Sequence, residues 1–172
     1  MKINNILLFL LIISLSIGCN QESKQKGFNK FSGLWSLHIM EQLNSETGEW
    51  SEYKYGVQGY ILYDDIGNMA VHITAKGYEN TDLEFPFLTD TLSNEALIHR
   101  TQSFVYFAKY TVSESSQIVE HARISHSNPG QWNQVVTRKF TFSGDTLILE
   151  PMEKNSARMR LKWIKESVSN KK

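Results

Sequence analysis

The stretch GYILYDDIGNMAVHIT, residues 59–74, is the clearest indication of the fold. Its centre, Asp64 to Asn68, is rich in the residues that form tight turns. Residues 60–63 before this turn are apolar or aromatic, and after it apolar side chains fall at every second position from Met69 to Ile73. An alternation of period two next to a turn predicts a β-hairpin.

The same pattern continues in both directions along the chain. The expected strands, separated by short turn-rich segments, are Trp35–Ile39, Trp50–Tyr55, Tyr60–Tyr63, Met69–Thr74, Phe104–Val112, Gln117–His126, Trp132–Phe142, Thr146–Glu150 and Ala157–Ile164. Between Thr89 and Gln102, Ser93 is a candidate N-cap, and Glu95–Arg100 has the pattern of a short helix. Short loops between strands favour an antiparallel meander. The sequence therefore predicts an all-β fold: an eight- to nine-stranded antiparallel meander barrel with one short helix.

Composition limits the possible functions. The 172 residues suit one domain, and the 18 basic residues balance the 18 acidic ones. This balance gives no broad basic field, so we expect no nucleic-acid partner. A single cysteine excludes an intramolecular disulfide and a cysteine-based zinc site.

The N-terminal segment has the pattern of an export signal. The apolar run Ile6–Ile17 would form a helix of about 18 Å, too short for a hydrocarbon core of about 30 Å. It ends at Gly18-Cys19, which resembles the lipobox of bacterial lipoproteins, although Ser16 stands where that motif usually has Leu. We therefore expect residues 1–18 to be a lipoprotein signal peptide, Cys19 to be lipidated and residues 19–30 to be a flexible tether in a bacterial cell envelope.

The remaining chain resembles a known family. Gly33-Leu34-Trp35 is similar to the Gly-x-Trp signature that begins lipocalins. The other segments that carry the resemblance are 59–69, 106–110, 138–140, 144–147 and 161–163. Together they resemble the bacterial and fungal lipocalin-like domain family over about residues 31–164, which implies a calycin-type barrel. We expect the barrel to occupy residues 31–166 and a polar tail to follow over residues 167–172. The family has no single established activity, and it often shows His-His where this chain has Glu120-His121.

One strand is expected to place a charge inside the barrel. Counting by twos from Trp132 puts Val136, Arg138 and Phe140 on one apolar face. An inward guanidinium needs a partner, and we expect Glu120 on the preceding strand to provide it. The pair is either structural or forms polar anchors in a ligand cavity.

Inward aromatic side chains favour a cavity that holds a small, mostly apolar ligand. The candidate ligand-binding residues are Glu120, Arg138, Tyr60, Tyr110, Trp132 and Phe140. Trp35 and Trp163, in contrast, are expected to plug the floor of the barrel.

Three functional hypotheses remain from the sequence. The first is a membrane-anchored lipoprotein whose barrel binds a small ligand. The second is an isomerase or cyclase with Glu120 as general base and Arg138 or Tyr110 as its electrophilic partner. The third is an envelope protein that binds a partner through residues 128–132 and Trp50. No catalytic motif and no metal-binding pattern among the five histidines is present, so no catalytic residue, metal or cofactor is predicted.

Overall fold

The structure is a computed structural model that describes residues 30–85, 91–153 and 158–167. The predicted signal peptide, Cys19, the tether up to residue 29 and the tail from residue 168 lie outside the described residues. None of the described helices is long and apolar enough to cross a membrane.

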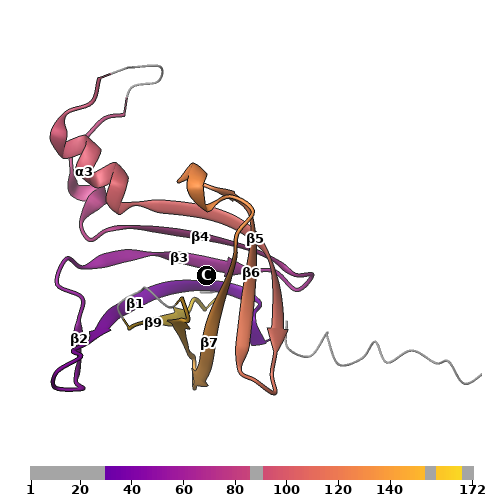
Figure 1. Ribbon diagram of the computed structural model, residues 1–172. Helices are drawn as coiled ribbons and strands as arrows, with labels where there is room; N and C mark the ends of the chain where they lie inside the picture. Colours follow the sequence, from indigo (N-terminus) through magenta and orange to yellow (C-terminus); the bar gives the residue numbers. More distant parts are fainter. Residues whose placement is uncertain (1–29, 86–90, 154–157, 168–172) are drawn as a thin grey trace, which may run out of the picture.

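Nine antiparallel strands form one sheet that closes on itself (Figure 1). The strands are β1 Gly33–Leu43, β2 Trp50–Glu52, β3 Val57–Tyr63, β4 Asn68–Ala75, β5 Phe104–Ser113, β6 Ile118–His126, β7 Val135–Ser143, β8 Thr146–Pro151 and β9 Met159–Lys165. Neighbours in sequence are neighbours in the sheet from β3 to β9, and β1 closes the barrel by pairing with both β3 and β9. The short β2 pairs with the end of β1. This confirms the predicted meander barrel.

The predicted hairpin is formed by β3 and β4, which are paired from Val57 opposite Ala75 to Tyr63 opposite Met69. Its turn is held by the Asp64 carboxylate, which accepts hydrogen bonds from the backbone N–H of Ile66 at 3.0 Å and of Asn68 at 2.6 Å. These bonds satisfy two backbone donors at the turn, as expected for a turn stabilised by Asp.

Outside the sheet, the described part of the chain has the helical segments η2 Tyr78–Asn80, α3 Asn94–Gln102 and η3 Pro129–Gln131. The hydroxyl of Ser93 accepts a hydrogen bond from the backbone N–H of Ala96 at 3.1 Å, which confirms the predicted N-cap of α3. Ala96 is the buried residue of this helix. Figure 1 shows α3 standing beyond the ends of β4 and β5.

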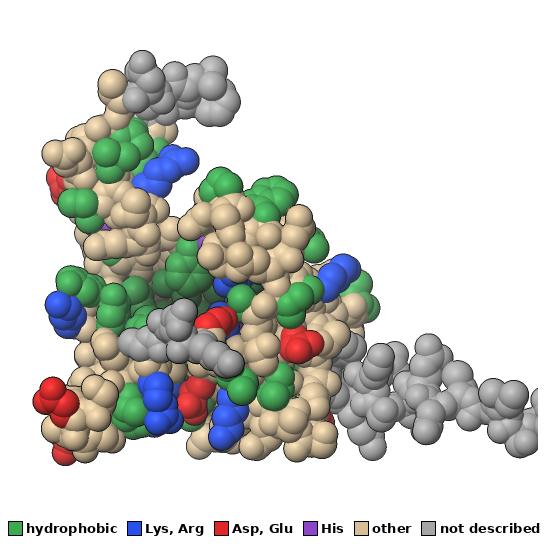
Figure 2. All heavy atoms as spheres, in the orientation of Figure 1, with side chains coloured by type: hydrophobic (Ala, Val, Ile, Leu, Met, Phe, Trp, Pro, Cys, Tyr) green, Lys and Arg blue, Asp and Glu red, His purple; other side chains and the backbone are tan. Residues whose placement is uncertain are grey.

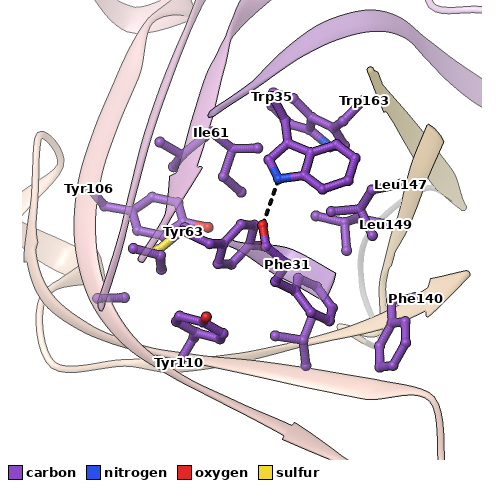
Figure 3. Close-up of a cluster of buried hydrophobic side chains, with 14 of the residues drawn as sticks. Phe31, Trp35, Ile61, Tyr63, Tyr106, Tyr110, Phe140, Leu147, Leu149 and Trp163 are labelled. Carbon is purple, nitrogen blue, oxygen red and sulfur yellow. Dashed lines mark hydrogen bonds between the residues drawn. The ribbon is translucent and has the colours of Figure 1, made fainter. Parts of the chain in front are cut away.

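One end of the barrel is filled by aromatic side chains (Figure 3). Phe31 packs edge-on against Tyr63, Phe140 and Phe142, with ring centroids 5.0–5.1 Å apart. The indole N–H of Trp35 donates to the carbonyl of Phe31 at 2.7 Å, so this buried donor is satisfied. This cluster forms the floor of the barrel, as predicted for Trp35, and leaves the opposite end open.

Candidate functional site

A cavity of about 450 Å³ extends from the centre of the barrel to the end beside α3. Figure 2 shows hydrophobic side chains gathered in a hollow below the helix. The apolar and aromatic residues that line the cavity are Met40, Tyr53, Tyr55, Val57, Ile61, Val71, Ile73, Ala75, Phe104, Tyr106, Leu149, Pro151, Met159, Leu161 and Trp163. The remaining lining residues are Gly56, Thr101, Gln102, His121, Arg123 and Arg138. The site is thus a mainly apolar cavity with a few polar groups on its wall.

His121 lies at the centre of the polar wall. Its Nε2 atom is 3.0 Å from the hydroxyl of Tyr63, and its Nδ1 atom is 2.9 Å from the hydroxyl of Tyr106. Burial, together with the charges of Arg138 and Arg123, lowers the pKa of His121 to about 3. Its imidazole is therefore neutral at pH 7, and both ring nitrogens have hydrogen-bond partners.

Two arginines complete this wall. Arg138 donates to the backbone carbonyl of Thr137 at 2.9 Å and forms an ion pair with Glu153. Arg123 is 8% exposed, donates to the side chain of Gln131 at 2.5 Å and lies over the ring of Tyr106, 4.8 Å from its centroid. Burial and the nearby Arg138 lower the pKa of Arg123, whereas Tyr106 and the Glu153 carboxylate act in the opposite direction. The two guanidiniums are therefore close enough for their positive charges to interact.

The inward position of Arg138 is confirmed, but the inward position of Glu120 is wrong. Residues directly opposite in an antiparallel pair share a face, and Arg138 is opposite Val119. Val119 and His121 therefore point inward, and Glu120 is exposed on the outside of the barrel. The inward face of β6 instead carries His121 and Arg123, which are stabilised inside by tyrosine and glutamine side chains. The partner of Arg138 is Glu153 instead.

The other candidate residues do not line this cavity. Tyr60 is 53% exposed on the outer face of β3, and Phe140 belongs to the buried floor. Tyr110 is also buried, and its hydroxyl donates to the carbonyl of Asp64 at 2.5 Å, where it supports the β3–β4 turn. Trp132 is 49% exposed in the loop before β7. The structure thus brings only Arg138 of the six predicted residues to the cavity.

The geometry also bears on the two alternative functions. With Glu120 outside the barrel, the proposed isomerase or cyclase site lacks its general base. Trp50 is half-buried, with the guanidinium of Arg160 over its ring at 4.3 Å, so the predicted protein-binding surface loses one of its two tryptophans. Within residues 30–85, 91–153 and 158–167, no three His, Cys, Asp or Glu side chains are grouped to hold a metal ion.

Sequence reasoning missed His121, Arg123 and Tyr106 as cavity residues. The pairing of β6 with its neighbouring strands, and not the hydrophobicity of β6, indicates which of its residues face the cavity. Arg138 faces inward and lies opposite Val119 on β6, so the alternation along β6 places His121 inward as well. Tyr110 lies opposite His121 on β5. A bulge between Phe107 and Ala108 shifts the register further along the same pair of strands.

The buried His121 makes stability sensitive to acid. Its pKa is about 6.5 in the unfolded chain and about 3 in the barrel, so between these values the unfolded state binds the extra proton. We expect the free energy of unfolding to fall by about 1.4 kcal/mol per pH unit below pH 6.5 because of this residue. Urea denaturation between pH 7 and 4.5 measures this slope. The slope should be smaller in His121→Gln and unchanged in His72→Gln, because His72 is exposed. Equal slopes in the two variants would contradict His121 as the source of the acid sensitivity.

A closed meander barrel with an aromatic floor and a mostly apolar cavity is an architecture typical of β-barrels that hold one small molecule. The model of the lipocalin-like domain family matches residues 32–168 of this chain. The protein belongs to this lipocalin-like domain family. The predicted family resemblance is therefore confirmed.

Solved structures give more distant similarities. The chain is similar to a redesigned β-barrel, with 12% identity, a TM-score of 0.40, and coverage of 81% of this chain and 94% of that one. It is also similar to a mutant of the fluorescent protein UnaG, with 13% identity, a TM-score of 0.37, and coverage of 81% and 98%. No curated protein matches the chain.

Proposed function

We propose that this protein is a lipid-anchored lipoprotein of a bacterial cell envelope whose barrel binds a small, mostly apolar ligand. The observation that carries the binding proposal is the cavity of about 450 Å³ above the aromatic floor. Pockets that bind small molecules typically have about 300–1,000 Å³, apolar walls and a few polar groups that orient the ligand. The cavity of this barrel has all three properties.

Membership of the lipocalin-like domain family supports the same proposal. The enclosed shape also favours an apolar ligand, because transfer of apolar surface from water into the barrel yields about 25 cal/mol per Å². The neutral His121 and the hydroxyl of Tyr106 then provide polar contacts without placing a third full charge on the wall.

Filling the cavity should abolish ligand binding. Ala75 lines the cavity on β4, whereas Ala70 on the same strand pairs with the outward residues Leu62 and Phe107. We expect Ala75→Trp to eliminate the fluorescence gain of N-phenyl-1-naphthylamine, a neutral apolar probe, because the indole would occupy the space of the probe. The titration uses the chain from residue 20 onward, which contains every described element. The control is Ala70→Trp, which adds the same bulk outside. No probe binding by the wild type, or equal binding by both variants, would refute the cavity proposal.

The anchoring part of the proposal rests on the N-terminal sequence. The apolar run Ile6–Ile17 followed by Gly18-Cys19 favours cleavage before Cys19 and acylation of that residue. Several acyl chains would hold the barrel firmly at a membrane surface, since each buried CH₂ contributes about 0.8 kcal/mol.

Expression in a bacterial host tests the anchor. Mass spectrometry of the wild-type chain should show an N-terminal Cys19 that carries acyl chains, and the Cys19→Ser variant should lack this added mass. The substitution is not expected to alter the barrel, because the sheet begins at Gly33. A mature wild-type chain with an unmodified Cys19 would contradict lipidation.

A further inference from the structure

The charges and hydrogen-bond donors of the cavity wall indicate which ligands it selects. The residues that line the cavity include Arg123 and Arg138 and no Asp or Glu. Glu153 pairs with Arg138, but no carboxylate of the described residues forms an ion pair with Arg123. The polar wall therefore has an excess of positive charge inside a mostly apolar barrel.

A buried guanidinium without an ion-pair partner is costly in this position. Arg123 is 8% exposed, and its Nε atom has no hydrogen-bond partner among the described residues. Removal of a charge from water costs several kcal/mol unless an opposite charge or hydrogen bonds compensate for it. Among the described residues, the Arg123 guanidinium donates to Gln131 and lies over the Tyr106 ring, which are both neutral, and the Glu153 carboxylate acts on it without forming an ion pair. A bound anion would supply the missing compensation.

The tyrosine pair on His121 adds another donor to the same wall. A neutral imidazole donates one hydrogen bond and accepts one, so one of the two tyrosine hydroxyls accepts from His121 and keeps its own hydrogen unused. Both tyrosines belong to the buried core, where an unused O–H is costly, but of the two only Tyr106 also lines the cavity. The tautomer with hydrogen on Nδ1 is thus favoured, and it leaves the Tyr106 O–H available to the cavity. Trp163, which also lines the cavity, has an indole N–H without a partner among the described residues.

We propose that the ligand of this barrel has a carboxylate group, held at Arg123 and Arg138 on the polar wall, and an apolar body that fills the rest of the cavity. This inference rests on the proposed ligand-binding function and specifies its chemical class. Arginine presents a planar fork of N–H donors that matches the two oxygens of a carboxylate. The carboxylate would accept hydrogen bonds from Arg123 and Arg138 and complete the charge balance of the wall.

Two probes of equal chain length test the proposal: decanoic acid and decan-1-ol, each labelled with ¹³C at C1. The full chain is held in phosphatidylcholine nanodiscs, and protein-free nanodiscs provide the lipid background. Hydrogen bonds to charged groups contribute about 1.5–3 kcal/mol, so NMR titration at pH 7 should show decanoate bound about ten- to a hundredfold more tightly than decanol.

Matched variants assign the effect to the arginines. Arg123→Gln and Arg138→Gln should each weaken decanoate binding about tenfold or more, while decanol binding, which reports an intact barrel, changes less than twofold. Arg158→Gln removes the same charge from an exposed residue outside the cavity lining and should leave both probes unchanged.

The outcomes separate this inference from the proposed function. Equal affinity for the two probes in the wild type would overturn the carboxylate proposal and leave apolar ligand binding intact. Binding of neither probe would overturn both. A preference for decanoate that persists in both arginine variants would overturn the assignment to Arg123 and Arg138.

Discussion

Replacement of Trp35 by Ala is expected to lower the free energy of unfolding by about 3–5 kcal/mol. Trp35 is 2% exposed, packs against Phe142 and donates its indole N–H to the Phe31 carbonyl at 2.7 Å. The substitution would open a cavity in the floor and leave a buried carbonyl without its donor. It would also weaken the seam where β1 meets both β3 and β9, because Trp35 pairs with residues of both strands.

Leu34→Ala is the matched control for this prediction. Leu34 is the preceding residue of β1, faces outward and is 40% exposed. We expect its substitution to cost less than about 1 kcal/mol in the same urea denaturation experiment. Similar losses in the two variants would show that the floor does not hold the barrel together as described.

Gly59→Ala should have a comparably large effect for a different reason. Gly59 has a φ of +154°, and a Cβ at this position would lie 2.0 Å from the carbonyl oxygen of His72 and 2.8 Å from the Cα of Ile73. Backbone strain costs about 1–3 kcal/mol and forced overpacking another 1–3, which gives a predicted loss of about 2–6 kcal/mol. The clash is with backbone atoms of β4, so rotation of a side chain cannot relieve it.

Gly48→Ala separates the two causes. Gly48 also has a positive φ, of +72°, but a Cβ there would have no heavy atom within 4 Å. This variant should lose only the conformational part, about 1–2 kcal/mol. Thermal or urea denaturation of both proteins measures the difference, and equal losses would eliminate the clash between β3 and β4 as a cause.

Local patterns were sufficient to predict most of the fold. The alternation from Met69 to Ile73, the Asp64 turn and the Ser93 cap each depend on residues close in sequence, and each forms as expected. The inward position of Arg138 also followed from the alternation along β7. These features are predictable because they depend on strand geometry and short-range hydrogen bonds.

The candidate site was less predictable because it depends on pairing between strands. The prediction placed Glu120 on the inward face of β6 as the partner of Arg138, whereas the structure has His121 inside and Glu120 outside. His121 is stable inside only because Tyr63 and Tyr106, from β3 and β5, meet both of its nitrogens. A partner 58 residues away in sequence leaves no local pattern that could predict it.

Methyl NMR of isoleucine-labelled protein during titration with decan-1-ol tests directly whether the ligand binds inside the barrel. Ile61 and Ile73 line the cavity, whereas Ile66 and Ile124 are exposed on the outside, at 77% and 53%. If the barrel binds its ligand inside, the methyl signals of Ile61 and Ile73 shift and saturate while those of Ile66 and Ile124 remain in place. Shifts confined to Ile66 and Ile124, or no saturable shift of Ile61 and Ile73, would contradict ligand binding inside the barrel.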